Sequence, residues 1–206
     1  MDRTRVGIVV FPDVEVLDFC GPFEVFSVTR LDEARRREEP SPFEVRLVAE
    51  TGDVVVATGG LRVLPDCTLT ECPPLDLLVV PGGWGTRRLL ERPPVLDWIA
   101  ARGAVVPTLT SVCTGALLLG KVGLLDGRRA TTHWHALDLL REVAPRAVVE
   151  DARRVVEDGH VVTSAGISAG IDMALRVVAR LHGERVARET ARHMEYPYSA
   201  DDRRRI

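Results

Sequence analysis

The chain has 206 residues, of which 46% are apolar and 28% are charged, and this is enough to bury a globular core as one domain over residues 1–206. A net charge of −3 and a pI near 6.0 do not favour binding to nucleic acid or to an anionic membrane. No apolar stretch is long enough to span a bilayer, and Val6–Phe11 is too short for the core of a signal peptide, so we expect a cytoplasmic protein.

The first half of the chain predicts strands more clearly than helices. Its expected elements, in order, are a buried strand at Val6–Phe11, a solvated helix end or loop at Asp32–Glu39, a strand at Phe43–Ala49, a hairpin in which Val54–Val56 and Leu61–Leu64 flank Thr58-Gly59-Gly60, and a buried strand at Leu77–Val80. Pro81-Gly82-Gly83 ends the last of these strands.

In the second half, helical patterns alternate with short apolar runs. The expected elements are a helix at Leu89–Arg102 interrupted or restarted by Pro93-Pro94, a strand at Val105–Leu109, a helix at Ala116–Lys121, a strand at Arg129–Thr132, a helix at His135–Val143, a strand at Val161–Ser164, and helices at Ile171–His182 and Glu184–Met194. The tail at 201–205 is basic only locally, and we expect it to be frayed.

This alternation predicts an α/β fold, a doubly wound sandwich with a mostly parallel sheet and helices on both faces. In such sheets ligands bind beyond the carboxyl ends of the strands. That rule selects four loop positions as candidate site residues: Asp18, Gly82-Gly83, Cys113-Thr114 and Thr132-His133.

Cys113 is the strongest candidate for a reactive group. An apolar strand ends at Ser111-Val112, the cysteine follows, and Thr114-Gly115 opens a helix, which is the layout of a nucleophile elbow. A thiol at the start of a helix is exposed to backbone N–H groups and to the positive end of the helix dipole, and both favour the thiolate. A buried, inert cysteine is the alternative interpretation of the same position.

The other three cysteines give no comparable signal. Cys20, Cys67 and Cys72 show no C-x-x-C spacing, and a reducing compartment disfavours disulfides. Cys67 and Cys72 lack the second Cys/His pair that would complete a zinc site, so we expect no metal and no cofactor. Cys20 is expected to pack as a small apolar residue.

Asp18 lies among apolar residues in Val16-Leu17-Asp18-Phe19-Cys20, where it is either a helix N-cap or a functional acid. If the loop after the first strand reaches Cys113, a carboxylate beside a thiolate raises both pKa values. The pair would then share a proton and titrate as a unit. A protonated Asp18 could supply a proton to a substrate.

Four further residues are candidates for binding the substrate. Gly82 and Gly83 permit close backbone approach, and with the Thr114 N–H they could form an oxyanion hole; a simple turn is the alternative. His133 could approach the cysteine as a base or orienting group, or be structural, whereas His135 is expected to be exposed. Trp84 could form a wall of the pocket or simply pack.

Several segments together resemble the ThiJ/PfpI superfamily. They are Gly7-Ile8-Val9-Val10-Phe11, Leu17-Asp18-Phe19-Cys20-Gly21-Pro22-Phe23-Glu24, Pro81-Gly82-Gly83, Val112-Cys113-Thr114-Gly115-Ala116, Ala130-Thr131-Thr132-His133-Trp134 and Thr163-Ser164-Ala165-Gly166. The resemblance covers nearly the whole chain and implies a flavodoxin-like three-layer sandwich, a catalytic cysteine and a homodimer.

Within this superfamily, the combination of Asp18, Cys113 and Thr114 is similar to that of the isonitrile hydratases, which convert an isonitrile to an N-substituted formamide. The resemblance implies that these three residues are catalytic. It leaves open whether Asp18 protonates the substrate or activates water.

Two other functions fit the same elbow. One is a glyoxalase or deglycase that acts on reactive carbonyls, in which His133 would matter more as a base. The other is a non-catalytic ligand- or redox-sensing protein related to the sensor domains of AraC-type regulators, in which Cys113 would be oxidised. No helix-turn-helix pair follows Met194, so a small molecule rather than DNA is the expected partner.

Overall fold

The fold is built around a seven-stranded sheet with the strand order β10-β11-β7-β6-β1-β2-β5. The computed structural model describes residues 3–199 and 203–204. In chain order the strands of this sheet are β1 Thr4–Val9, β2 Phe43–Ala49, β5 Cys67–Thr68, β6 Leu77–Val80, β7 Thr108–Val112, β10 Val155–Asp158 and β11 Val161–Ser164. All neighbouring strands are parallel except β10, which pairs antiparallel with β11 at one edge.

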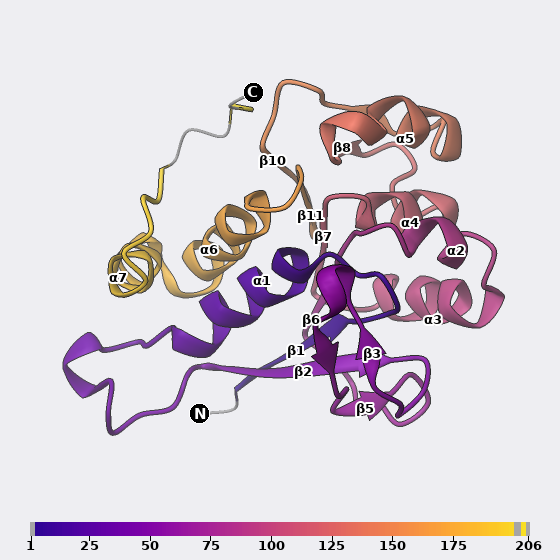
Figure 1. The fold of residues 1–206 in the computed structure, drawn as a ribbon. Coiled ribbons are helices and arrows are strands. Elements are labelled where there is room, and N and C mark those ends of the chain that lie inside the picture. Colours follow the sequence, from indigo (N-terminus) through magenta and orange to yellow (C-terminus); the bar gives the residue numbers. More distant parts are fainter. Residues whose placement is uncertain (1–2, 200–202, 205–206) are drawn as a thin grey trace.

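Helices cover both faces of the sheet (Figure 1). One face carries α1 Val16–Val28, α6 Ala169–His182 and α7 Glu184–His193, and the other carries α2 Thr86–Leu89, α3 Pro93–Gly103, α4 Gly115–Lys121 and α5 Leu137–Val143. The expected α/β sandwich with a mostly parallel sheet is therefore confirmed. Across residues 3–199 and 203–204, no helix is long and apolar enough to cross a membrane.

Burial explains why the central elements form. All four residues of β6 and all five of β7 are buried, as expected for parallel strands that are covered on both faces. Helix α4 is buried along Gly115–Gly120 because it lies between the sheet and the helices α2, α3 and α5. Helix α6 buries one face and exposes the other, and its buried side packs against α1 and the sheet.

Some boundaries differ from the sequence predictions. β7 begins at Thr108 instead of Val105, because Val105 is 75% exposed, and it continues through Val112, so the strand runs up to Cys113. The run expected as a strand at Arg129–Thr132 forms only β8 Arg129–Ala130, which pairs with β9 Val148–Val149 outside the main sheet. The edge strand β10 was not predicted, since its half-buried sequence is polar at Glu157 and Asp158.

The largest difference is helix α1, which was not predicted. Asp18 lies in the first turn of this helix and not in a loop. The sequence pattern does not predict this helix because Gly21 and Pro22 both disfavour helix interiors. Here Pro22 lies within α1, and a Cβ on Gly21 would lie 3.0 Å from the Ile171 side chain of α6, so the glycine permits a close helix contact.

The remaining short elements follow the predictions more closely. The hairpin is confirmed as the antiparallel pair β3 Val55–Val56 and β4 Arg62–Val63, joined by a 3-10 turn at Thr58–Gly60. Two more 3-10 turns lie at Glu33–Arg35 and Trp134–Ala136.

The C-terminal tail is docked at the residues that the structure describes, contrary to the expectation of fraying. The backbone of Arg203 forms an isolated antiparallel β-bridge with that of Arg153. The Arg204 side chain donates to the Thr132 carbonyl at 3.0 Å and to Thr131 Oγ1 at 2.9 Å. The other tail residues of this prediction, 201, 202 and 205, lie outside the described residues.

We predict that Gly115→Ala destabilises the protein severely. A Cβ at this position would lie 1.9 Å from the Val80 carbonyl oxygen, and this backbone atom cannot move without disrupting β6. We expect a loss of roughly 3 kcal/mol or more in the free energy of unfolding, measured by urea denaturation. Gly52→Ala is the matched control, because the nearest atom to its Cβ is 4.0 Å away. Equal stability of the two variants would contradict the packing described here.

Candidate active site

Cys113 forms a strained turn between β7 and α4. Its φ of 56° lies in the left-handed region, which is unusual for a residue with a side chain. Its N–H donates to the Ser164 and Ala165 carbonyls at 3.2 Å each, and Thr132 Oγ1 donates to its carbonyl oxygen at 2.7 Å. These bonds hold the elbow in a conformation that it would otherwise leave, as is common at functional sites.

Asp18 is completely buried beside this turn. Its Oδ2 accepts the Gly82 N–H at 2.9 Å, while its Oδ1 has no hydrogen-bond partner among the described residues. Burial raises the pKa of the carboxyl to about 8, and nearby Glu15 adds to this, although the Gly82 N–H and Cys113 oppose it. Asp18 is therefore a neutral acid at neutral pH, with an oxygen free to carry the proton.

Cys113 is only 6% exposed. Burial raises its pKa, and the Asp18 carboxyl raises it further, whereas the N–H and hydroxyl of Thr114 lower it. The stabilisation of a thiolate by the start of α4 is thus present but is outweighed by burial. The sequence expectation that the pKa values of both the acid and the thiol are raised fits this geometry, whereas the expected stabilisation of the thiolate by the helix start is not large enough to lower the pKa of the thiol.

Gly82 and Gly83 connect the acid to Thr114. A Cβ on Gly82 would lie 2.5 Å from the Thr114 nitrogen and 2.9 Å from Asp18 Oδ2, so only glycine fits between them. The Gly82 N–H donates to Asp18, and the Gly83 N–H donates to Thr114 Oγ1 at 3.0 Å. Both donors are engaged, so this arrangement offers no free N–H at the two glycines for the expected oxyanion hole.

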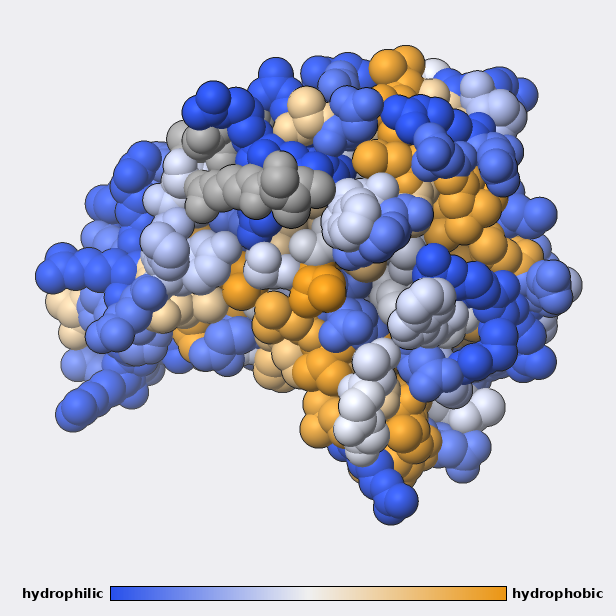
Figure 2. All heavy atoms as spheres, turned by 45° about the horizontal axis from the view of Figure 1, so that its top comes forward, coloured by the Kyte–Doolittle hydropathy of each residue, from blue (hydrophilic) through white to orange (hydrophobic). Residues whose placement is uncertain are grey.

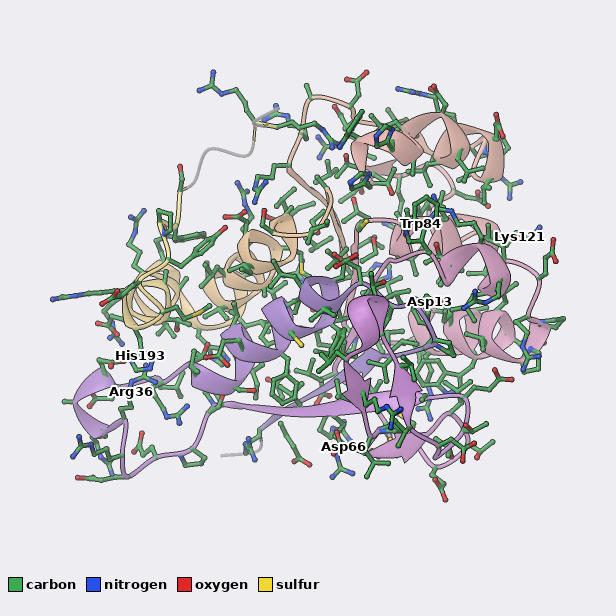
Figure 3. The ribbon with its side chains drawn as sticks, viewed as in Figure 1. Asp13, Arg36, Asp66, Trp84, Lys121 and His193 are labelled. Atoms are coloured by element: carbon green, nitrogen blue, oxygen red, sulfur yellow. The ribbon has the colours of Figure 1, made fainter. Side chains whose placement is uncertain are left out.

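A cavity of about 460 Å³ opens over the cysteine. It is lined by Glu15, Gly83, Trp84, Arg87, Cys113, Thr114, His133, His135 and Ile167. This volume suits a small molecule. Trp84, labelled in Figure 3, projects from the segment between β6 and α2 and is 72% exposed.

His133 lies in the cavity wall but makes no hydrogen bond with Asp18 or Cys113. Its Nδ1 accepts the His135 N–H at 3.3 Å, and its ring packs against Gly166, where a Cβ would lie 2.0 Å from Cδ2. Burial lowers the pKa of His133, and the neighbouring His135, Arg204 and Arg87 lower it further. The ring is therefore neutral near pH 7.

Four wall residues were missed or given another role by the sequence reasoning. His135 is exposed as expected, yet it also lines the cavity. Glu15 could have been found only with α1 recognised, since it directly precedes the helix and lies about one turn before Asp18. Arg87, three residues after Trp84, and Ile167, with a φ of 52°, gave no signal in the sequence.

The other cysteines stand apart from this site. Neither Cys20, Cys67 nor Cys72 lines the cavity, and burial raises the pKa of each thiol. Within residues 3–199 and 203–204 no group of three or more His, Cys, Asp or Glu residues is arranged to hold a metal ion. The candidate reactive groups at this site are the Cys113 thiol, the Asp18 carboxyl and the Thr114 hydroxyl.

Comparison with known proteins identifies the family. The DJ-1/PfpI family profile matches residues 4–180. The chain belongs to the DJ-1/PfpI family. Among curated DJ-1/PfpI relatives, the isonitrile hydratase of Pseudomonas putida is 38% identical over 192 residues, which are 93% of this chain and 78% of that protein. The transcriptional regulator CdhR of Pseudomonas aeruginosa is 32% identical over 86% of this chain, which spans about half (51%) of the regulator.

Solved structures agree with this assignment. A ThiJ/PfpI family protein from Pseudomonas syringae superposes with a TM-score of 0.84 at 33% identity, over 97% of this chain and 77% of that one. Drosophila melanogaster DJ-1beta superposes with a TM-score of 0.79 at 21% identity, over 95% of this chain and all (100%) of that one, and shows the shared fold.

We predict that Asp18 makes stability fall with rising pH. Folded Asp18 keeps its proton up to about pH 8, whereas an unfolded aspartate releases it near pH 4. The contribution of the neutral carboxyl is therefore complete below about pH 4 and is lost as pH rises toward 8. The Asp18→Asn variant lacks this loss, so urea unfolding should show its stability rising by a few kcal/mol relative to wild type between pH 5 and pH 8.

The exposed Asp97→Asn, in α3, is the control for this measurement, and it should track the wild type at both pH values. An identical pH dependence of the wild type and Asp18→Asn would show that the buried carboxyl is ionised in the folded state.

Proposed function

We propose that this protein adds water to an isonitrile to give an N-substituted formamide, with Cys113 as the nucleophile and Asp18 as the proton donor. One observation carries the proposal: a neutral, buried carboxyl lies beside a thiol that lines a small cavity. The terminal carbon of an isonitrile must gain both a nucleophile and a proton. Cys113 can supply the nucleophile, and Asp18 can supply the proton. The similarity to the isonitrile hydratase of Pseudomonas putida supports the same activity.

In the first step the thiol adds across the terminal carbon. Asp18 gives its proton to that carbon while Cys113 Sγ forms the S–C bond and its own proton passes to the carboxyl. The product is a neutral thioimidate, Cys–S–CH=N–R, and Asp18 is again protonated. Because no net charge develops, the buried site does not have to stabilise a separated ion pair.

In the second step water replaces sulfur. Asp18 relays a proton from the attacking water to nitrogen, giving a tetrahedral Cys–S–CH(OH)–NH–R intermediate. The C–S bond then breaks, sulfur regains a proton from the hydroxyl through Asp18, and R–NH–CHO is released. Under this proposal Asp18 serves as both donor and water activator, so the two roles left open by the sequence belong to successive steps.

Thr114 is proposed to fix the position of the Cys113 thiol relative to the Asp18 carboxyl. Its backbone N–H and hydroxyl interact with the Cys113 thiol. The same hydroxyl accepts from Gly83 N at 3.0 Å and from Thr86 Oγ1 at 3.1 Å. Gly83, His133 and Trp84, which line the cavity, are proposed to contact the substrate, and Gly82 is proposed to position the Asp18 carboxyl through its N–H.

The geometry supports carbonyl chemistry less well. A glyoxalase or deglycase needs a base near the thiol. His133 makes no hydrogen bond to Cys113, and its Nδ1 is occupied by the His135 N–H. A sensing function, which the similarity to the regulator CdhR would favour, does not require the neutral acid beside the thiol.

We also propose a homodimer. Apolar side chains are exposed on α1 at Leu17 and Phe23 and around the hairpin at Val56 and Leu61, and Figure 2 shows apolar residues gathered on part of one face. Light scattering should give twice the chain mass of 22.6 kDa. A monomeric mass at assay concentrations would contradict a dimeric enzyme.

Removal of the thiol or the acid should abolish turnover. With cyclohexyl isocyanide as the probe, we expect Cys113→Ser to lower kcat/KM by at least about 10³-fold and Asp18→Asn by at least about 10²-fold. Formation of the formamide is followed by NMR, and the covalent thioimidate by mass spectrometry. Cys20→Ala, in α1 outside the cavity, is the matched cysteine control and should stay within about three-fold of wild type.

Undiminished hydration by Cys113→Ser would refute the nucleophilic role. If the wild type hydrates no isonitrile but converts an α-oxoaldehyde, the carbonyl function replaces the one proposed. Turnover of neither substrate, together with oxidation of Cys113 to the sulfinate by peroxide, would favour a sensor.

A further inference from the structure

One cation in the cavity wall has no acidic partner among the described residues. Arg87, in α2, lies with its guanidinium carbon 4.9 Å from the centre of the Trp84 ring, a cation–π contact that fixes the plane of the group. No carboxylate of residues 3–199 or 203–204 pairs with it. Its neighbour Arg88, by contrast, pairs with Asp13 at 2.7 Å. An arginine held in place without a counter-ion is available to a ligand.

Only one nitrogen of the Arg87 guanidinium, Nη1, donates hydrogen bonds to described residues. Nη1 donates long bonds to the Gly83 carbonyl at 3.4 Å and to Thr86 Oγ1 at 3.3 Å. Nε and Nη2 donate to no described residue. Two parallel N–H groups on one edge of a guanidinium match the two oxygens of a carboxylate. The free edge therefore has the geometry of a carboxylate receptor.

Charges divide the cavity into two ends. Arg87 lines the cavity together with His133, and Arg204 and Arg87 both lower the pKa of His133, so positive charge lies on that side. Glu15, the acidic residue of the wall, raises the pKa of Asp18 and so lies toward the acid. A ligand with a neutral reactive end and an anionic end would place the neutral end at Cys113 and Asp18, and the anion at Arg87.

We propose that the substrate is an isonitrile that carries a carboxylate, and that Arg87 binds this carboxylate through its Nε and Nη2 edge. This inference rests on the proposed function and narrows its substrate class. Hydration changes only the isocyano group, so the product is the matching N-formyl amino acid with its carboxylate intact. Arg87 acts on specificity and takes no part in the proton transfers.

Matched acids and esters test the assignment. The probes are isocyanoacetate, 3-isocyanopropanoate and 4-isocyanobutanoate, each compared with its methyl ester, because the pairs differ mainly in charge. For at least one chain length we expect wild-type kcat/KM to favour the acid by about ten-fold or more. The Arg87→Gln variant should lose this preference by raising KM for the acid, while the ester stays within about three-fold.

Arg88→Gln is the control, because Arg88 carries the same charge on the same helix but pairs with Asp13 and does not line the cavity. It should keep the wild-type preference. Adding salt should weaken the preference in the wild type and leave Arg87→Gln unchanged.

Other outcomes separate this inference from the proposed function. If cyclohexyl isocyanide is hydrated but acids and esters are treated alike, or if Arg87→Gln lowers both equally, the carboxylate assignment is wrong and the hydratase function stands. If no isonitrile is hydrated, the function fails, and calorimetric binding of N-formylglycine against its methyl ester to Cys113→Ser decides the assignment. Tighter binding of the acid that depends on Arg87 supports the anion site, and equal binding overturns it.

Discussion

Two ionisable groups meet at the end of the central strands, and neither can be charged there without a large desolvation cost. Asp18 is completely buried and Cys113 nearly so. The surrounding backbone fits around this contact. Gly82 has no side chain because Asp18 and Thr114 occupy the space on both sides of it, and Cys113 adopts a left-handed conformation so that its thiol meets the acid. The resulting pair is neutral at rest and can exchange protons without creating net charge.

This neutrality distinguishes the site from the more familiar thiolate nucleophile at a helix start. The Thr114 N–H favours a thiolate here too, but burial has the larger effect. A neutral thiol–acid pair suits a substrate that must accept a proton and a nucleophile at one carbon, and suits less well a reaction in which a base must remove a proton from substrate. Charge is also distributed unequally along the cavity wall. Glu15 lies toward Asp18, and the arginines Arg87 and Arg204 lie near His133. Under the two proposals, the chemistry depends on Cys113 and Asp18, whereas the orientation of the substrate depends on the charged residues of the cavity wall.

The sequence identified the parts of the site that depend on local pattern. Cys113 follows a run of apolar residues and precedes Thr114-Gly115, and that pattern alone places it at the carboxyl end of a strand. Asp18 was recognised as an unusual acid among apolar residues, but its helix was missed because Gly21 and Pro22 argue against one. What could not be predicted are facts of tertiary geometry. The N–H groups of Gly82 and Gly83 donate to Asp18 and Thr114 instead of facing a substrate, and Arg87 lies over Trp84 at the cavity.

The central claim is that Asp18 is protonated beside Cys113 at neutral pH, and infrared difference spectroscopy tests it directly. The difference spectrum between the wild type and Asp18→Asn isolates the carbonyl band of one carboxylic acid. The account predicts that this band is present at pH 7 and disappears as pH rises through about 8. A spectrum at pH 7 that contains only carboxylate bands, with the acid band appearing near pH 4 as in an exposed aspartate, would contradict it.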